Sequence, residues 1–167
     1  MQEYYFGRGL RTSFKLGTLL ATVLTLLSAD RASAQDGPGK YITEASARLI
    51  KLVNNAHANG YRLQNNSFSL GGGWLTQGQN NWVALYTITL DAGKEYRFMA
   101  AGDYDAKDVD LQVLDPSNNV VAQDVGVEPE AIVNYRANTT GRYLVRIRLY
   151  ASENNLPCMC LGVVMVK

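Results

Sequence analysis

Aspartate is concentrated in one stretch of this chain, and carboxylates at that density can bind a hard cation. Five aspartates fall between positions 103 and 115, and carboxylates that close repel one another unless water, hydrogen bonds or a cation separates them. Four of them could supply oxygen ligands to a calcium ion, although their spacing differs from that of the helix–loop–helix calcium loop. These four are Asp103, Asp105, Asp108 and Asp110.

A hydrogen-bonded turn is the alternative interpretation of the same stretch. Asp103 and Asp105 would then bond backbone groups through their side chains. Asp108 or Asp110 would point inward and pair with an arginine such as Arg146. We favour the turn over the calcium site.

The two cysteines, Cys158 and Cys160, could carry redox or metal chemistry. In a strand their side chains share one face, with Cα atoms about 6.6 Å apart, which is near the upper limit for a disulfide. Three states are open: a strained disulfide, a bond to another chain, and a soft-metal site with His57. Export makes free thiols less stable, so we favour oxidation, which would stabilise the C-terminal end.

No residue pattern predicts catalysis. His57 is the only histidine, and a general base needs a nucleophile and an orienting partner. Neither a Gly-x-Ser-x-Gly nor a His-Glu-x-x-His motif is present. We expect a partly buried structural histidine and no enzyme activity. A hydrolase that uses the aspartates is the least favoured alternative.

Trp74 and Trp82 flank a polar loop and are candidate binding residues. If exposed, their rings could stack on sugars or on a partner surface. If buried, they would cap a sheet, which is the commoner situation. Gly71, Gly72 and Gly73 precede Trp74 and favour a bulge or a close approach of the backbone to a neighbouring strand.

Residues 1–34 have the pattern of a secretory signal peptide. Basic residues precede a short apolar run over residues 16–29, and Ala32-Ser33-Ala34 is a small-residue cleavage site. The run is too short for a membrane span of about 20 residues. We therefore expect a secreted or periplasmic protein with no stable membrane anchor after cleavage.

The remaining 133 of the 167 residues are enough for one domain. They carry 12 basic and 13 acidic side chains, a balance that gives no electrostatic reason to expect a nucleic-acid partner.

Residues 35–60 and residues 61–167 differ in their hydrophobic period. In the first part we expect a flexible lead-in over residues 35–41 and an amphipathic helix over residues 44–58, capped by Thr43 and stopped at Asn59-Gly60. In the second part apolar residues alternate over short segments separated by turns. The segments are residues 82–90, 95–101, 109–113, 120–122, 131–135, 143–149 and 161–166. They predict an all-β fold, an antiparallel, jelly-roll-like β-sandwich.

Four of these segments, in this order, resemble the bacterial pre-peptidase C-terminal domain family. They are TLDAGKEYRF at residues 89–98, GDYDAKDVDL at 102–111, LDPSNNVVAQD at 114–124 and GRYLVRI at 141–147. The likeness covers residues 82–167 and implies a small jelly-roll-like sandwich that assists a catalytic partner or binds a polymer. The chain departs from the family in its Cys-Met-Cys tail and in having no catalytic domain before residue 82.

Together these features predict an exported, non-catalytic module that binds an extracellular polymer or a secreted partner protein. The alternative is a structural domain that aids folding or secretion of a separate enzyme, with the helix over residues 44–58 as its docking element.

Overall fold

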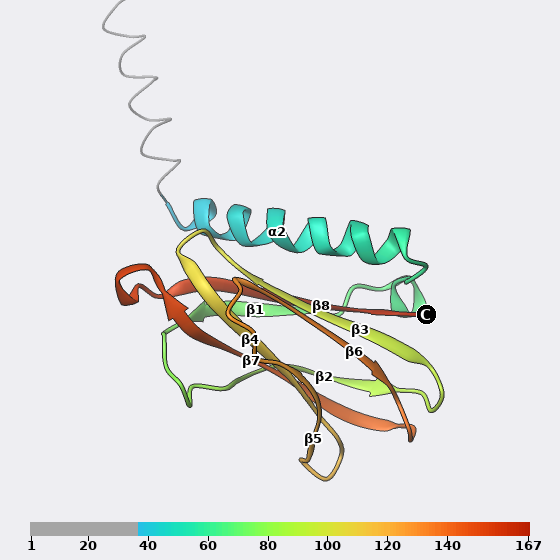
Figure 1. Ribbon diagram of the computed structural model, residues 1–167. Coiled ribbons are helices and arrows are strands. Elements are labelled where there is room, and N and C mark those ends of the chain that lie inside the picture. The colour runs from blue at the N-terminus through green and yellow to red at the C-terminus, as the bar shows by residue number, and fades with distance from the viewer. Residues whose placement is uncertain (1–36) are drawn as a thin grey trace, which may run out of the picture. The chain divides into compact units, whose positions relative to one another are not determined.

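The computed structural model describes residues 37–167, so the predicted signal peptide at residues 1–34 lies outside the described part of the chain (Figure 1). The elements run in the order α2 (Pro38–Ala58), a 3-10 turn (Gln64–Asn66), β1 (Leu70–Leu75), β2 (Val83–Leu90), β3 (Glu95–Gly102), β4 (Ala106–Leu114), β5 (Val120–Asp124), β6 (Glu130–Arg136), β7 (Gly141–Ser152), a second 3-10 turn (Glu153–Asn155) and β8 (Cys158–Val166). The described helices include none long and apolar enough to cross a membrane.

The strands form two four-stranded antiparallel sheets. One has the order β1-β8-β3-β6 and the other the order β2-β7-β4-β5. This is the strand order of a jelly roll, so the predicted all-β sandwich is confirmed. Strand β1 lies at the edge of the first sheet and β2 at the edge of the second.

The main core lies between the two sheets. In β7 buried residues alternate with less buried ones, as expected for a strand with one face against the core. The largest side chains that are completely enclosed there include Tyr96, Phe98, Leu111, Tyr143 and Ile147.

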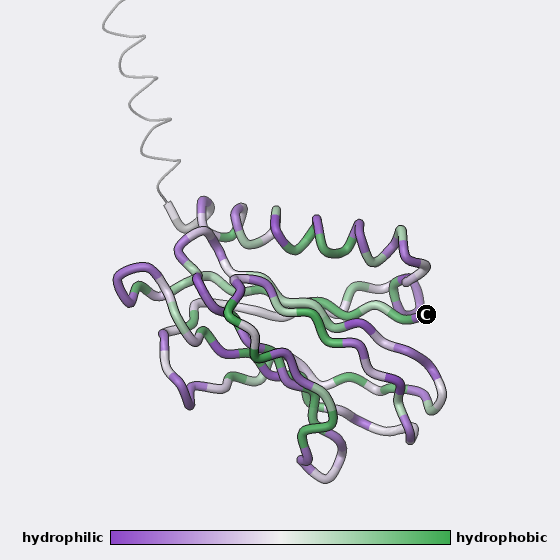
Figure 2. Tube along the Cα trace, viewed as in Figure 1, coloured by the Kyte–Doolittle hydropathy of each residue, from purple (hydrophilic) through white to green (hydrophobic). Residues whose placement is uncertain are grey.

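Helix α2 covers the outer face of β3 and β8. Figure 2 shows that the hydrophobic residues of α2 lie on the side of the helix that faces the strands. Leu49, Leu52 and Ala56 pack against Met99 and Met165 in a second apolar cluster. The amphipathic helix therefore lies on the sandwich, and its apolar stripe is used inside the chain rather than left for a partner.

The helix begins at Pro38, six residues before the predicted start. The predicted cap at Thr43 is wrong, because its hydroxyl donates to the carbonyl of Gly39 one turn earlier, inside the helix (2.7 Å). Proline is favoured in the first turn, where its missing N–H costs no helical hydrogen bond. The predicted stop is confirmed: Gly60 has φ +90°, and the Tyr61 N–H bonds to the carbonyl of Ala56 (3.1 Å).

Strand β1 is the element that the sequence did not predict as a strand. Its three glycines lower strand propensity and hide the alternation of its apolar residues. The predicted close approach is confirmed at Gly71, where a Cβ atom would lie 2.8 Å from the carbonyl oxygen of Leu85 on β2. Glycine thus lets the two edge strands lie against each other.

Candidate functional site

Asp103 is the centre of a buried turn. Its side chain is fully enclosed, and its two oxygens accept hydrogen bonds from the N–H of Asp105 (3.1 Å) and the N–H of Met159 (2.6 Å). Arg48 adds a bond to the Asp103 carbonyl (2.6 Å). The predicted side-chain-to-backbone turn is therefore confirmed for Asp103, while Asp105 takes part through its backbone N–H. The turn ties β3 and β4 to β8.

The predicted pairing of Asp108 or Asp110 with an arginine is confirmed for Asp110, whose partner is Arg148 rather than the example Arg146. The predicted inward direction is wrong, because the pair lies on the outer face of the sheet. The Arg148 Nε donates to the Asp110 carboxylate at 2.5 Å, and both side chains are largely buried. The strand register decides the partner: Asp110 stands opposite Arg148 on β7, and Gln112 stands opposite Arg146. Accordingly, the Arg146 Nε donates to the side-chain oxygen of Gln112 (2.8 Å).

The four predicted calcium ligands do not form one cluster. Asp103 and Asp105 belong to the turn, while Asp108 and Asp110 lie on the outer face of β4, against the loop after β5. Within residues 37–167, no group of three or more His, Cys, Asp or Glu side chains is placed to hold a metal ion. Calcium binding stays a prediction from the sequence.

Cys158 and Cys160 are both free thiols and both fully buried in the main core. The favoured disulfide is therefore not seen. Burial, and then the nearby Asp103 carboxylate, raises the pKa of Cys158 to about 12; burial raises the pKa of Cys160 further. His57 is exposed on α2, so it is neither partly buried, as predicted, nor joined to the cysteines.

The two tryptophans belong to different surfaces. Trp82 is half-buried, and the guanidinium groups of Arg146 and Arg148 lie 5.1 and 4.6 Å from the centre of its ring. Trp74 is 48% exposed at the end of β1 and makes an edge contact with Tyr41 of α2, with ring centres 5.1 Å apart. Of the two predicted binding residues, Trp74 is the more available.

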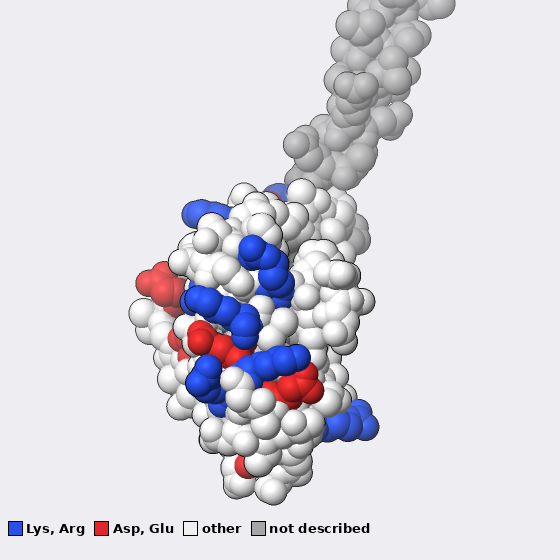
Figure 3. Space-filling view, turned by 90° about the vertical axis from the view of Figure 1, so that its right-hand side faces the viewer, with Lys and Arg blue, Asp and Glu red and all other residues white. Residues whose placement is uncertain are grey.

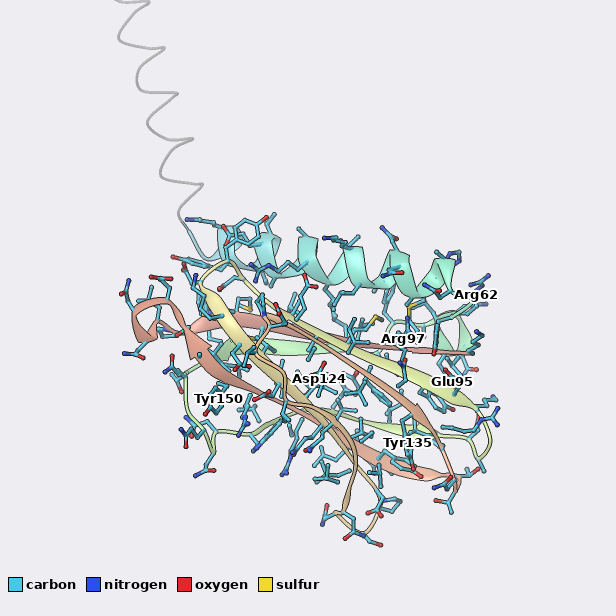
Figure 4. The ribbon with its side chains drawn as sticks, in the orientation of Figure 1. Arg62, Glu95, Arg97, Asp124, Tyr135 and Tyr150 are labelled. Carbon is cyan, nitrogen blue, oxygen red and sulfur yellow. The ribbon has the colours of Figure 1, made fainter. Side chains whose placement is uncertain are left out.

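The end of the sandwich near the C-terminus carries two charged side chains, Glu95 and Arg97, that bond neutral polar neighbours. The Tyr61 hydroxyl donates to Glu95, and the Arg97 guanidinium lies 4.3 Å from the centre of the Tyr61 ring (Figure 4). The Arg97 Nε also donates to Asn134 (2.7 Å). Basic and acidic side chains are mixed on this side of the molecule, with no extended region of one sign (Figure 3).

An apolar groove of about 410 Å³ lies between α2 and β1. Its lining includes Ile50, Val53, Phe68, Leu70, Leu161 and Val163. Three of these side chains are unusually exposed for their type, Ile50 at 57%, Phe68 at 63% and Leu70 at 56%. Contiguous exposed apolar surface on a folded domain commonly marks an interaction site.

Strand β1 forms one wall of this groove and is also an open sheet edge. Within the described chain it pairs only with β8, which leaves the backbone groups on its other side without a strand partner. Its sequence, LGGGWL, contains no lysine or proline to block pairing. On its inner face, a crevice of about 120 Å³ between the sheets is lined by residues that include Gly73, Trp74 and Val83.

Sequence reasoning missed the groove. Phe68, Leu70 and Trp74 share a period of two through Gly72, which is the signal that could have revealed β1. Ile50 stands off the buried stripe of α2, which could have marked a second apolar surface on the helix.

Comparison with known proteins gives little guidance. No family model matches the sequence, and no curated protein matches it. Among solved structures, one similar chain is that of Aeromonas hydrophila PliG, a periplasmic lysozyme inhibitor of g-type lysozyme. The sequences are 14% identical, the match covers 60% of this chain and 85% of that one, and the TM-score is 0.42. The resemblance to the pre-peptidase C-terminal domain family stays a prediction.

Proposed function

We propose that this protein is an exported, non-catalytic module that binds an extended apolar segment of a secreted partner protein along β1. The observation that carries the proposal is a sheet edge that pairs with no other strand of residues 37–167, with an apolar groove beside it. Extended peptides commonly bind by adding a strand to such an edge.

The two hollows on either side of β1 suit the side chains of an added strand. Successive side chains of a strand point to opposite faces of the sheet. A segment paired with β1 would direct one set toward the groove beside Leu70 and the other toward the crevice beside Gly73. Backbone hydrogen bonds would supply affinity, and the two hollows would select apolar side chains.

A polysaccharide ligand is less well supported by these surfaces. Sugar rings stack on open aromatic faces, but the Trp82 ring already lies beside Arg146 and Arg148. The groove is lined mainly by aliphatic side chains and offers few hydrogen-bonding groups for hydroxyls.

Docking through the helix alone is also less well supported. Leu49 and Leu52 of α2 are buried against the sheet, which leaves Ile42 and Ile50 as its exposed large apolar residues. These can extend a contact made at the groove, whereas the edge of β1 offers backbone pairing as well.

Site-specific photocrosslinking in cells that export the protein tests the proposal. A photoreactive phenylalanine analogue replaces Phe68 in the groove, and in a matched control it replaces Ile132, which is 40% exposed on β6 at the other edge of the same sheet. We expect one crosslinked protein from position 68 and none from position 132.

A second variant shows whether that crosslink depends on the groove. Leu70→Asp places a charge on the exposed rim, so the crosslink at position 68 should fall at least fivefold while the amount of exported protein stays the same. Equal crosslinking at positions 68 and 132, or no protein adduct at position 68, would contradict the proposal. Crosslinking to polysaccharide would favour the polymer alternative.

A further inference from the structure

A further hollow lies on the β2-β7-β4-β5 sheet, which does not contain β1. It is a pocket of about 280 Å³ on the outer face of β4 and β7, closed on one side by the loop between β5 and β6. We call it the Asp108 pocket, and its lining residues are Asp108, Asp110, Val125, Val127, Arg148 and Tyr150.

Asp108 is the unusual residue of this pocket. Its side chain is 7% exposed, yet its Oδ1 atom has no hydrogen-bond partner, a property that it shares with only the Tyr86 hydroxyl among buried side-chain atoms of the described chain. Buried polar groups are normally hydrogen-bonded, so an exception calls for an explanation. A donor supplied by a ligand would provide one.

The neighbouring carboxylates do not share this deficiency. Asp110 holds the Arg148 guanidinium. Asp124 of β5 accepts hydrogen bonds from the N–H groups of Gly126 (3.1 Å) and Ile132 (2.8 Å). Among these three carboxylates, therefore, only Asp108 has a buried oxygen that accepts no hydrogen bond from the described chain.

The charge around Asp108 favours a cation. Asp110 and Asp124 add negative charge beside it, and Arg148 is the opposing positive group. Burial, and then the Asp110 carboxylate, raises the pKa of Asp108 to about 6. Arg148 makes its own contacts elsewhere: its guanidinium donates to Asp110 and to the carbonyl of Gln79. It also lies over the Trp82 and Tyr150 rings.

The walls of the pocket favour a cation carried on an aliphatic chain. Val125 and Val127 are 50% and 80% exposed at its rim, and Tyr150 forms part of its wall. Lysine and arginine pack their methylene groups on apolar surface and keep the charged head on a polar group. A bare divalent ion would make no use of the valines.

We propose that the Asp108 pocket receives a lysine or arginine side chain of a partner protein, whose charged head donates to the Asp108 carboxylate. The aliphatic part of that side chain lies against Val125, Val127 and Tyr150. This site is separate from the groove at β1, so the partner would meet the module on a second surface of defined chemistry.

Titrations followed by backbone amide NMR test this inference on the purified, processed protein. The probes are three blocked tripeptides, Gly-X-Gly, in which X is lysine, arginine or the uncharged isostere norleucine. We expect the two cationic peptides to shift the amide signals of Val127 and Tyr150 and to bind at least tenfold more tightly than the norleucine peptide.

Two variants locate the charge. Asp108→Asn keeps the shape of the side chain and should weaken lysine-peptide binding at least tenfold. The matched change Asp105→Asn, in the same aspartate stretch but outside the pocket, should alter binding by less than twofold. Gly73→Lys at β1 should also have no effect, which separates this test from that of the groove.

Three outcomes would overturn the inference: equal binding of the norleucine peptide, undiminished binding by Asp108→Asn, and displacement of the lysine peptide by calcium chloride at micromolar concentration. The last result would identify the pocket as a metal site.

Discussion

The two outer faces of the sandwich differ in the kind of side chain that has no partner within the described chain. On the β1-β8-β3-β6 sheet, α2 covers part of the apolar surface and leaves Phe68 and Leu70 exposed beside an open edge. On the β2-β7-β4-β5 sheet, arginine, glutamine and aspartate side chains bond one another across the strands, and Asp108 is the exception. The first face lacks an apolar partner, and the second lacks one hydrogen-bond donor.

This difference indicates that burial alone does not identify a binding surface. Asp103 and Asp108 are both buried carboxylates of one short segment, but donors of the chain satisfy Asp103 and leave Asp108 with an unpaired oxygen. Leu52 and Ile50 lie two residues apart on α2, and one is enclosed while the other is 57% exposed. In each pair one residue marks a candidate site. Asp108 does so because one of its oxygens accepts no hydrogen bond, and Ile50 does so because its apolar side chain is exposed.

The largest effect should come from Arg148→Ala on the charged face. The change leaves Asp110, whose side chain is 2% exposed, without its ionic partner, and breaking a buried pair in this way costs about 3–5 kcal/mol. Urea unfolding monitored by fluorescence measures the loss. Arg142→Ala is the matched control, because Arg142 bonds the exposed Thr87, and its cost should stay below about 0.5 kcal/mol.

On the helix-covered face, Leu52→Ala should lower the free energy of unfolding by about 3 kcal/mol, because it opens a cavity between α2 and the sheet. Ile50→Ala on the same helix should change it by less than about 0.5 kcal/mol, since the side chain is exposed. If both changes destabilise equally, Ile50 is packed inside the fold and the groove is not an open site.

Asp108→Asn should make the protein more stable at pH 7. The pKa of Asp108 is raised from 3.8 to about 6, so between these values the folded chain keeps a proton that the unfolded chain has released. Stability therefore falls as the pH rises from about 4 through 6. Two pKa units correspond to at most about 3 kcal/mol; because solvent reaches the pocket, we expect roughly 2 kcal/mol.

Urea unfolding of the wild type and of Asp108→Asn between pH 4 and pH 8 measures this difference. The two stability curves should meet near pH 4, diverge between pH 4 and 6, and keep a constant separation above pH 6. Parallel curves over this range would show that Asp108 is solvated normally and would remove the distinction between it and its satisfied neighbours.

The smallest effect concerns Cys158 and Cys160, which belong to the core between the two faces. Because both thiols are buried and their pKa values are raised, a thiol reagent at pH 8 should label neither in the native protein. Both should react in concentrated urea. Failure to react in urea without a reductant would show a disulfide, contrary to the structure.

The sequence predicted those parts of the molecule whose signals are local. The alternation in β7 and the turn at Asp103 each depend on neighbours within a few residues, and both are confirmed. Arg146 was the wrong partner for Asp110 because the pairing depends on the register of β4 and β7, which no local pattern specifies. Strand β1 was missed because its three glycines have low strand propensity, and the close approach to β2 that Gly71 allows is a property of the fold.

The candidate sites were harder to predict because each joins segments that are distant in sequence. The groove unites Ile50 of α2 with Leu70 of β1 and Val163 of β8. The Asp108 pocket unites β4, β7 and the loop after β5. Sequence reasoning selected Asp108 and Trp74 from their types, but the absence of a donor for Asp108 and the open edge beside Trp74 are properties of the fold.

The most direct test of the central claim is peptide binding to the edge of β1. Random linear 12-residue peptides are selected on the purified protein, and their dissociation constants are measured with Gly73→Lys and Gly73→Ala variants. A Cβ atom at Gly73 would meet no atom within 4 Å, so both variants should fold, and lysine blocks edge pairing.

We predict that the selected peptides share a run of successive apolar residues, because both hollows beside β1 select apolar side chains. Gly73→Lys should weaken their binding at least tenfold, and Gly73→Ala should change it by less than threefold. Peptides that bind Gly73→Lys as tightly as the wild type would contradict the claim that β1 is the binding edge.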